Sequence, residues 1–495
     1  MNDLKRLLVS AISLAVISAA GGIPSPQAAD VDALKQNAWS WLDSQTQILE
    51  TANLNIWSYA ETSLEETKSS KELQGLLVDN GFSVESGVAG METAFVATYG
   101  SGKPVIGILA EFDALPGVSQ AASPTPGIGP NPEAGHACGH SVFGVGSAGA
   151  AMAIKELIAS GAFEGTIKLY GTPAEETGIG KVYMLRDGYF KEDDVILNWH
   201  PTDRNRASYG NTKAIVNVKF RFKGSAAHAS AMPWSGRSAL DGVELMSAGV
   251  NYMREHIKPD ARIHYVITKG GGQPNVVPPE AEVWYYIRAD KFTDVVSYFE
   301  WVKEIAEAAA KMSRTELEAV EVQSEIHEMI TVRALAEQTH KNLSAIGAPK
   351  WEAQELAFAR TTQLEFQDPF GRAIGDDDTP ALATHIEPLP DQPTPARAST
   401  DVGDISWFVP IGGLGVASYG QGLPTHSWPV VAATGTSIGT KALVTAAKTM
   451  TATAIDLYTD PDLMERVKAD WRKSRGDAPF ETLIPDGQPA PLSVR

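Results

Sequence analysis

Cysteine is almost absent from this chain of 495 residues, in which Cys138 is the single thiol. One cysteine cannot form a disulfide within the chain, so no bridged framework supports the fold. Positive charge is also scarce, with 41 Lys and Arg against 60 Asp and Glu and a formal net charge of −19. A surface this acidic lacks the clustered cations that phosphate-backbone binding requires, which excludes nucleic acid as a partner.

Long apolar runs are scarce as well. The N-terminal stretch Leu7–Ala20 is too short for a membrane-spanning helix, and no other stretch reaches the roughly 18 unbroken apolar residues that such a helix needs. That stretch follows Lys5 and Arg6 and precedes the small-residue end Gln27–Ala29, an order typical of a secretory signal peptide. We therefore predict a signal peptide at 1–29, a periplasmic or secreted bacterial protein, and no membrane contact after cleavage. A retained membrane anchor or a misassigned start are the alternatives.

Hydrophobic residues make up 43% of the chain, enough for a sizeable core, and the length suggests two to four domains at roughly 100–200 residues each. Helical spacing runs from Val31 to Gly81, and a small-residue helix is predicted over Ser147–Ser160. Between and after them come short apolar runs typical of strands: 82–84, 94–99, 105–110, 166–170 and 195–199. This alternation predicts an α/β fold whose sheet is covered on both faces.

From about Ala214 the pattern changes. The segment 216–222 alternates apolar and polar residues strictly, as expected of a sheet with one solvated face. Two long helical stretches and three further strands follow, at 239–256, 263–268, 281–288, 293–312 and 317–326. We therefore predict an inserted α+β domain over 214–330, which leaves 30–213 and 331–495 for the α/β domain. A Pro- and Asp-rich surface loop is expected over 367–397, between helices at 334–346 and 435–458.

Metal-ligating side chains gather in four places. Cys138 and His140 lie between glycines after a Pro/Gly-rich loop, and thiolate and imidazole are ligands that borderline-soft metals prefer. His200 stands at the end of a predicted strand, where open α/β sheets place ligand sites, and His426 lies in a later Gly/Pro-bounded loop. Each signal alone is weak, since a buried Cys or His often serves only the core.

Two adjacent carboxylates, Glu175 and Glu176, follow another apolar strand inside a glycine-rich loop. A solvated loop or an acidic helix N-terminus would explain them without chemistry. In extended backbone, however, neighbouring side chains point opposite ways, so one could bind a metal while the other moves protons. The candidate ligands are too many for one open zinc site, and they suit two ions about 3.5–4 Å apart. They are Cys138, His140, Glu176, His200 and His426.

Seven ordered motifs over residues 35–458 resemble the co-catalytic metallopeptidase family of aminoacylases and carboxypeptidase G. The resemblance is strongest to the amidohydrolase branch that contains hippurate hydrolases, auxin-conjugate hydrolases and one of the two aminobenzoyl-glutamate hydrolase subunits, the B type. The motifs are AEFDALP (110–116), HACGH (136–140), GTPAEE (171–176), GSAAHA (224–229), NVVP (275–278), STDVGD (399–404) and HSW (426–428).

This resemblance implies a three-layer di-metal catalytic domain interrupted by a smaller dimerisation domain. It assigns the five residues above as metal ligands and Glu175 as general base. It makes His228 the group that steadies the oxyanion, often across a dimer interface. It makes Asn275 and Arg288 the groups that hold a substrate carboxylate, although Arg288 could equally be a surface residue in a salt bridge. By the same comparison, Asp113 would support the ligands and Ser399, Thr400 and Asp401 would form a pocket loop, with Asp404 structural.

The chain departs from the family pattern at three positions. Ser141 stands where this branch has Asp or Asn, and Thr177 and Ile179 replace small residues after the paired glutamates. These differences bear on the substrate rather than on the reaction.

We therefore predict a metal-dependent amidohydrolase that uses two zinc or manganese ions per chain on a small amide with a free carboxylate. The substrate would be an N-acyl amino acid or an aminobenzoyl-glutamate-like amide, and the protein would be a homodimer, with a second kind of subunit as a possible partner. A dipeptidase or carboxypeptidase is the alternative function, followed by a non-catalytic periplasmic binding protein. A Cys138 nucleophile with His140 as base is weaker, because it leaves His200, His426 and Glu176 without a role.

Overall fold

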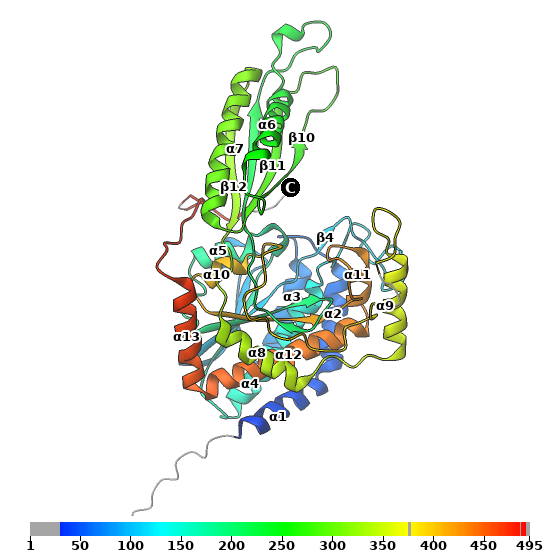
Figure 1. Ribbon diagram of the computed structural model, residues 1–495, viewed down its shortest axis with the longest axis vertical. Coiled ribbons are helices and arrows are strands. Elements are labelled where there is room, and N and C mark those ends of the chain that lie inside the picture. Colours follow the sequence, from blue (N-terminus) through cyan, green and yellow to red (C-terminus); the bar gives the residue numbers. More distant parts are fainter. Residues whose placement is uncertain (1–29, 375–377, 486, 492–495) are drawn as a thin grey trace, which may run out of the picture. The chain divides into compact units, whose positions relative to one another are not determined.

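The computed structural model describes residues 30–374, 378–485 and 487–491. The predicted signal peptide, 1–29, lies outside the described residues. Figure 1 shows helices stacked against a central sheet and, above them, a second group of strands and helices drawn in green.

A seven-stranded sheet forms the centre of the α/β part, in the order β1-β2-β6-β3-β7-β13-β8. The four strands β6, β3, β7 and β13 are parallel, and β1, β2 and β8 are antiparallel to their neighbours. The strand bounds are β1 Ser83–Ser86, β2 Phe95–Ser101, β3 Val105–Ala110, β6 Gly165–Gly171, β7 Val195–Thr202, β8 Arg206–Ala207 and β13 Ile411–Ala417. All six residues of β3 are buried, as its continuous apolar sequence predicts for a strand covered on both sides.

Two apolar clusters cover the two faces of this sheet, which confirms the predicted α/β class. On one face Ile106, Ile108 and Leu197 pack with residues of α4 and α12. On the other, Leu109, Tyr170 and Ile196 pack with α5 and α10. The helices of this part are α1 Val31–Ser44, α2 Thr46–Tyr59, α3 Thr67–Asp79, α4 His140–Ala159, α5 Gly180–Arg186, α8 Arg333–Ile346, α9 Ala353–Glu365, α10 Val402–Ser406, α11 Trp428–Thr434, α12 Ser437–Thr459 and α13 Pro461–Arg475.

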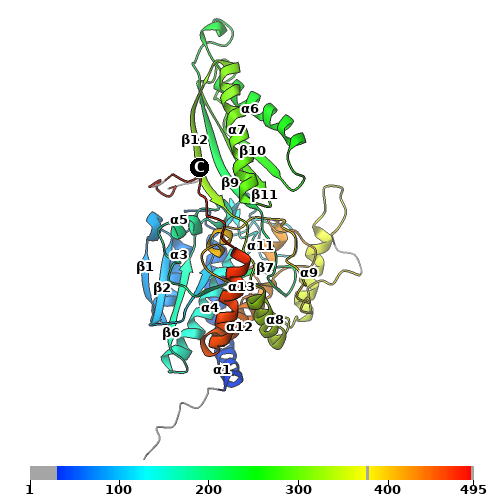
Figure 2. The same ribbon diagram turned by 60° about the vertical axis from the view of Figure 1, so that its left-hand side comes forward.

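A four-stranded antiparallel sheet, in the order β10-β11-β9-β12, accounts for the changed pattern after residue 214. Its strands are β9 Ala214–Lys223, β10 Arg262–Lys269, β11 Glu280–Ala289 and β12 Glu316–Ile326. The helices α6 Ala239–Met253 and α7 Phe292–Ser313 pack on the face that carries Val216, Val218 and Phe220, as Figure 2 shows. The predicted domain boundaries themselves stay a prediction.

The C-terminal segment runs back to β12. The backbone N–H of Leu483 donates to the Glu325 carboxylate, and the Gln488 side-chain amide donates to the Val322 carbonyl at 2.9 Å. Ile484 is buried in the same apolar cluster as β9 and β11. The last described residues are thus tied to the four-stranded sheet by both polar and apolar contacts.

Several elements went unpredicted or were misplaced. The helical segment predicted over 31–81 consists of three helices, and the predicted helix 147–160 begins at His140. The strand β13 and the helices α9, α11 and α13 were not predicted. Among the described residues, α4 has the length and apolar composition of a membrane span; the bent pair α11–α12 also does if taken as one span. Most of α4 is buried inside the fold, which is typical of a core helix.

Candidate metal centre

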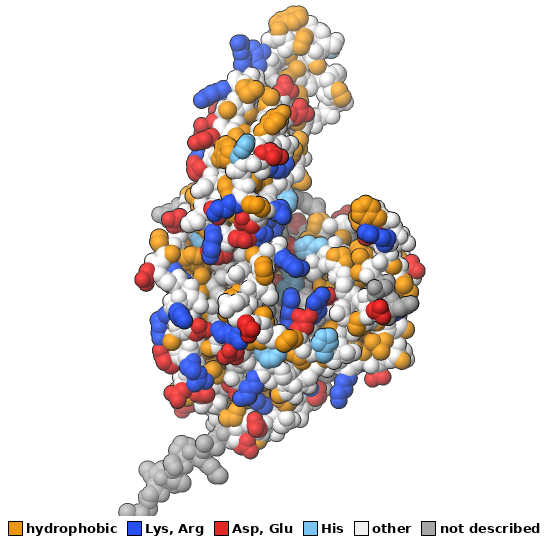
Figure 3. Space-filling model, in the orientation of Figure 1, with side chains coloured by type: hydrophobic (Ala, Val, Ile, Leu, Met, Phe, Trp, Pro, Cys, Tyr) orange, Lys and Arg blue, Asp and Glu red, His pale blue; other side chains and the backbone are white. Residues whose placement is uncertain are grey.

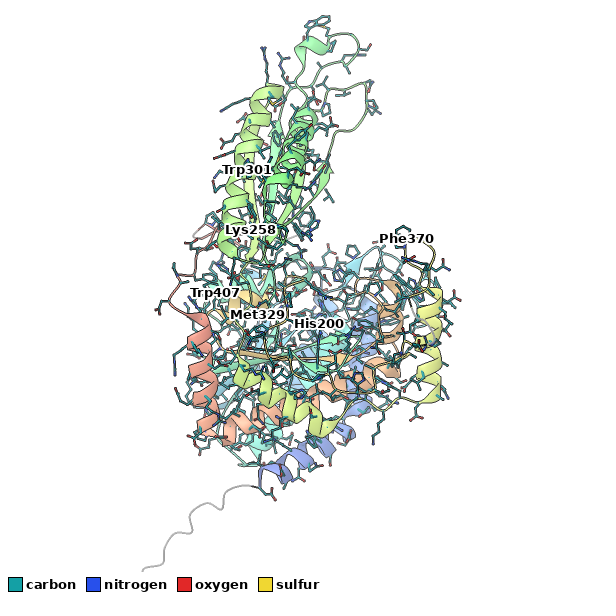
Figure 4. The ribbon with its side chains drawn as sticks, viewed as in Figure 1. His200, Lys258, Trp301, Met329, Phe370 and Trp407 are labelled. Atoms are coloured by element: carbon teal, nitrogen blue, oxygen red, sulfur yellow. The ribbon has the colours of Figure 1, made fainter. Side chains whose placement is uncertain are left out.

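The four parallel strands end at one edge of the seven-stranded sheet, and their carboxyl ends deliver the predicted ligands. Asp113 follows β3, Glu175 and Glu176 follow β6, and His200 lies within the last part of β7. Cys138 and His140 come from the loop that opens α4, and His426 from the loop after β13. Figure 4 labels His200 at this edge.

A left-handed turn at Gly139 brings Cys138 and His140 to the same place. Its φ of +81° favours glycine, and a Cβ there would lie 2.9 Å from the Pro201 ring. Cys138 lies in the loop before α4, and His140 is the first residue of that helix.

A first group consists of Cys138, His140 and His200, which each offer one ligand atom within 4.8 Å of the others. The Cys138 Sγ lies 3.4 Å from the His200 Nε2. His140 Nδ1 lies 2.8 Å from Asp113 Oδ1, and His200 Nδ1 lies 2.8 Å from the Pro201 carbonyl. In both rings, therefore, Nε2 is the nitrogen left for a metal, the arrangement in which outer hydrogen bonds fix the tautomer.

A second group shares Cys138 and adds Glu176 and His426. The His426 Nε2 lies 3.4 Å from the Glu176 Oε2, and the other oxygen of Glu176 is buried without a hydrogen-bond partner among the described residues. His426 takes a positive φ of 60°, and its backbone N–H donates to the Ala137 carbonyl, which anchors the loop beside Cys138.

The paired glutamates do not lie in extended backbone, so that prediction was wrong. Glu175–Thr177 is a single 3-10 turn entered through Ala174 at φ 57°. The two side chains still diverge: Glu176 reaches the second group, whereas the Glu175 Oε2 lies 4.0 Å from the His140 Nε2. Two buried carboxylates hold the backbone of this turn: Asp113 Oδ2 accepts the backbone N–H of Glu176, and the Glu66 carboxylate accepts that of Ala174.

The same turn is tied to the four-stranded sheet. The Thr177 carbonyl accepts hydrogen bonds from the Asn217 side-chain amide and the Ser324 hydroxyl, both at 3.1 Å. Thr177 therefore connects the paired glutamates with β9 and β12.

A third group contains a residue that sequence reasoning missed. Glu111, His140 and Glu175 also offer ligand atoms within 4.8 Å of one another. The Glu111 Oε2 lies 3.2 Å from the His140 Nε2. Glu111 follows the buried strand β3 directly, two residues before Asp113, and this position after an apolar strand was the signal that could have identified it.

A fully buried lysine lies behind this group. The Lys181 Nζ is 2.8 Å from Glu111 Oε1 and 2.6 Å from Asp401 Oδ1. Asp401, expected in a pocket loop, is instead buried in this ion pair. Asp404 is structural, as predicted: its carboxylate lies 2.8 Å from His327 Nδ1 and accepts the His327 backbone N–H.

Burial is the main cause of the pKa shifts in this centre. Burial and the neighbouring His140 lower the pKa of His200 to about 4, so its imidazole is neutral at neutral pH. Burial, with Glu111, Asp401 and Glu176 nearby, raises the pKa of Glu175 well above its usual range. Burial and Glu176 also raise the pKa of the Cys138 thiol.

These donors fit divalent ions. Three buried atoms at the centre have no hydrogen-bond partner in the described part of the chain: Glu111 Oε2, His140 Nε2 and Glu176 Oε1. Buried polar atoms are normally paired, so converging unpaired ones indicate a place for a cation. Thiolate, imidazole and carboxylate are together the ligand set of zinc and related metals.

The predicted residues of the four-stranded sheet are arranged differently. Arg288 in β11 is half-buried, its Nη1 lies 3.4 Å from the Ser399 hydroxyl, and its Nε has no partner among the described residues. His228 and Asn275 are exposed neighbours: the Asn275 carbonyl accepts the Ala229 N–H, and His228 Nδ1 accepts from Ser230 and Ala231. In the described residues no contact joins these two to the metal-ligating groups.

The positions that depart from the family pattern also differ in their surroundings. Ser141 is buried at the start of α4 and its hydroxyl has no partner in the described residues. Ile179 is fully buried in the apolar cluster that contains Leu109, Tyr170 and Ile196. Thr177 instead accepts the hydrogen bonds from Asn217 and Ser324.

A fold with metal-ligating groups at the carboxyl edge of a mixed sheet, and with a separate α+β sheet, defines a metal-dependent hydrolase of the co-catalytic type. The family model for a peptidase dimerisation domain matches residues 211–313. The chain is 38% identical over 463 residues to the B-type polypeptide of the p-aminobenzoyl-glutamate hydrolase of Escherichia coli, covering 88% of this chain and 95% of that protein.

The chain is also similar to a second curated protein and, in its fold, to a solved structure. A mouse Xaa-Arg dipeptidase is 27% identical over 463 residues, covering 90% of this chain and 94% of the relative. A crystal structure of a dinuclear metal-binding peptidase of the M20 family from Bacillus subtilis superposes with a TM-score of 0.50 at 17% identity, over 84% of this chain and 99% of that one. The chain belongs to the M20 peptidase family, in its aminobenzoyl-glutamate hydrolase branch, and is a hydrolase of amide bonds.

Proposed function

We propose that the protein binds two divalent ions and hydrolyses a small amide whose released amine carries a carboxylate, as in an aminobenzoyl-glutamate-like compound or an N-acyl amino acid. The observation that carries this proposal is the position of Cys138, which belongs to both the His140–His200 group and the Glu176–His426 group. One shared ligand between two groups is the arrangement expected of a two-ion centre.

Ions held by these groups would polarise the amide carbonyl and make water a stronger nucleophile. Glu175 is the residue placed to move the proton, since it faces His140 while Glu176 faces His426. Burial raises the pKa of Glu175, so its carboxylate is a better proton acceptor than an exposed glutamate. Glu175 takes a proton from the attacking water and returns it to the nitrogen of the leaving amine.

Arg288 supports the choice of an anionic substrate. Its guanidinium stacks on Tyr286, with 5.4 Å between Cζ and the ring centre, and its Nε has no partner among the described residues. Directly across the ladder from Arg288 in β11 stands Arg262 in β10. The Arg262 guanidinium is bonded to the Pro259 and Ala261 carbonyls, whereas that of Arg288 has an unpaired Nε, and a guanidinium is the natural partner of a carboxylate. Figure 3 shows Lys and Arg side chains over this region of the molecule.

His228 and Asn275 act from a second chain in this proposal. Their exposure within one chain, together with the match to a dimerisation domain, supports an oligomer in which these residues complete the neighbouring centre. His228 then donates to the oxyanion of the transition state and Asn275 to the substrate. The oligomer is a homodimer, or a complex with a second kind of polypeptide, for which the two named subunits of p-aminobenzoyl-glutamate hydrolase are the precedent.

Zinc is the ion favoured by the thiolate of Cys138, and manganese is the alternative favoured by the carboxylates. The residues at 1–29 support export to the periplasm through a signal peptide. A dipeptidase is the second candidate function, supported by the similarity to the mouse Xaa-Arg dipeptidase. A non-catalytic binding protein is disfavoured, because all five ligand positions and Glu175 hold competent residues.

Elemental analysis of the purified chain, combined with turnover of aminobenzoyl-glutamate, hippurate and a dipeptide panel, tests the proposal. We expect about two ions per chain and release of the free amino acid from an aromatic amide. Turnover of dipeptides alone would select the second candidate. A chain that takes up no stoichiometric metal, even under reducing conditions with zinc or manganese added, would overturn the mechanism.

A further inference from the structure

Glu111 places an unpaired carboxylate oxygen inside the centre. Glu111 is buried, and its Oε2 lies 3.2 Å from the His140 Nε2. Neither atom has a partner of hydrogen-bond geometry among the described residues. The contact is therefore one of charge, between a carboxylate oxygen and a ring nitrogen that lie close together without the geometry of a hydrogen bond.

The other oxygen of Glu111 is already occupied. Lys181 lies 2.8 Å from Oε1, and the same ammonium lies 2.6 Å from Asp401. The single positive charge of Lys181 can neutralise only one of the two carboxylates, Glu111 and Asp401. Lys181 holds Oε1, whereas Oε2 lies beside His140 in the group that also contains Glu175.

Binding of an ion to His140 changes what Glu111 faces. Asp113 holds the Nδ1 of His140, so an ion can bind only at Nε2, and a metal-bound nitrogen carries no proton. The Glu111 Oε2 would then be a buried charged atom beside a neutral ring, an arrangement that is strongly unfavourable when nothing replaces the lost partner. A cation at the same place supplies that partner.

We propose that Glu111 is a further ligand of the ion bound by His140, through Oε2, and that Lys181 is the positioning residue that holds Oε1 away from it. This inference rests on the proposed two-ion centre and adds a sixth ligating side chain to the five predicted ones. It also accounts for a buried lysine in α5, which would otherwise serve only to neutralise carboxylates.

Zinc binding to the metal-free full-length chain, measured by competition with a chelator, tests this assignment through Glu111→Gln. The amide keeps the size of the side chain but is a poor metal ligand. We expect one of the two sites to weaken by more than about 100-fold, which exceeds the roughly 10- to 100-fold typical of residues that only orient a ligand. Glu325→Gln is the matched control: it is another buried glutamate, bonded to the C-terminal segment, and should bind zinc as the unaltered chain does.

A zinc-loaded crystal structure of the unaltered chain gives a second readout that does not depend on a variant folding. We expect an anomalous peak about 2.0–2.2 Å from Glu111 Oε2. A distance beyond about 3 Å, or a loss of zinc affinity of about 100-fold or less in Glu111→Gln, would overturn the assignment. If the unaltered chain itself binds no stoichiometric zinc, the two-ion proposal fails instead.

Discussion

Asp113 Oδ1 lies 2.8 Å from the Nδ1 of His140, so one carboxylate fixes the orientation of the ring whose other nitrogen points into the centre. The second oxygen of Asp113 accepts the backbone N–H of Glu176 at 3.0 Å. The Asp113 side chain therefore fixes both the ring orientation of His140 in the first group and the backbone position of Glu176 in the second.

Replacing Asp113 by Asn should weaken metal binding without abolishing it. The amide cannot stabilise the His140 tautomer as a carboxylate does, and it retains only one acceptor for two contacts. We expect zinc affinity to fall by roughly 10- to 100-fold, as measured by chelator competition. Ser63→Ala is the control, since Ser63 only donates to Asp113 at 3.2 Å, and an equal loss in both variants would contradict this role.

Metal binding should release a proton from Cys138. Burial and Glu176 raise the pKa of its thiol, so the metal-free chain is protonated there at neutral pH, whereas a ligand must be a thiolate. Zinc affinity should therefore increase with pH, by about tenfold per unit for each proton released. Calorimetry in buffers of different ionisation enthalpy counts these protons. In Cys138→Ser the count should fall by one; an unchanged count would place the thiol outside the centre.

Removing the carboxylate of Glu175 should abolish turnover while metal stays bound. In Glu175→Gln we expect kcat to fall by roughly 10²- to 10⁴-fold, because the attacking water loses its proton acceptor. Metal content, measured on the same preparation, separates this loss from a loss of ions. Turnover near that of the unaltered chain, with two ions present, would show that another group is the base.

Arg288 should determine affinity for the substrate carboxylate. A hydrogen bond to a charged group contributes about 1.5–3 kcal/mol, so Arg288→Met should raise KM by roughly 10- to 100-fold with a smaller change in kcat. The matched comparison is the same substrate with its carboxylate converted to an amide. That compound should be turned over equally by both chains, and a parallel loss on both substrates would point to a structural role.

Glu325 should make stability depend on pH. Burial raises the pKa of this carboxyl from 4.5 to about 7, helped by the nearby Asp404 and opposed by hydrogen bonds from the C-terminal segment. Because the folded-state pKa is the higher one, the folded chain binds more protons between these values, and stability falls as pH rises from about 4.5 to 7. The expected span is about 3 kcal/mol. Glu325→Gln should flatten this slope in denaturant unfolding; an unchanged slope would assign it to other groups.

The α/β class could be predicted because apolar runs such as Val105–Ala110 are continuous and bounded by turn-forming or polar residues. The strand β13 was missed because its sequence, IGGLGVA, contains three glycines and looks like a loop. It forms a strand because parallel pairing with β7 compensates for the low propensity of glycine. Tertiary pairing of this kind leaves no local signal.

Sequence chemistry could single out the residues that group at the carboxyl edge of the sheet as candidate ligands, but it could not predict their geometry. The sequence separates Cys138 from Glu176 and His426, and only the shared edge of the sheet brings them together. Glu111 and Lys181 were missed for a related reason. Lys181 lies in a short helix of seven residues, where a single charged residue is normally solvated. Its burial depends on ion pairs with Glu111 and Asp401, both of which lie far from Lys181 in the sequence.

The hydrogen bonds of the Thr177 carbonyl couple the position of the Glu175–Thr177 turn to the four-stranded sheet. It is held by Asn217 of β9 and Ser324 of β12, while the adjoining Glu175 and Glu176 belong to the metal centre. A rotation of the four-stranded sheet relative to the seven-stranded one would either break these two hydrogen bonds or move the Glu175–Thr177 turn together with the four-stranded sheet. In the proposed function Glu175 transfers the proton and Arg288 binds the substrate carboxylate, so a change in the orientation of the four-stranded sheet would affect substrate binding and catalysis together.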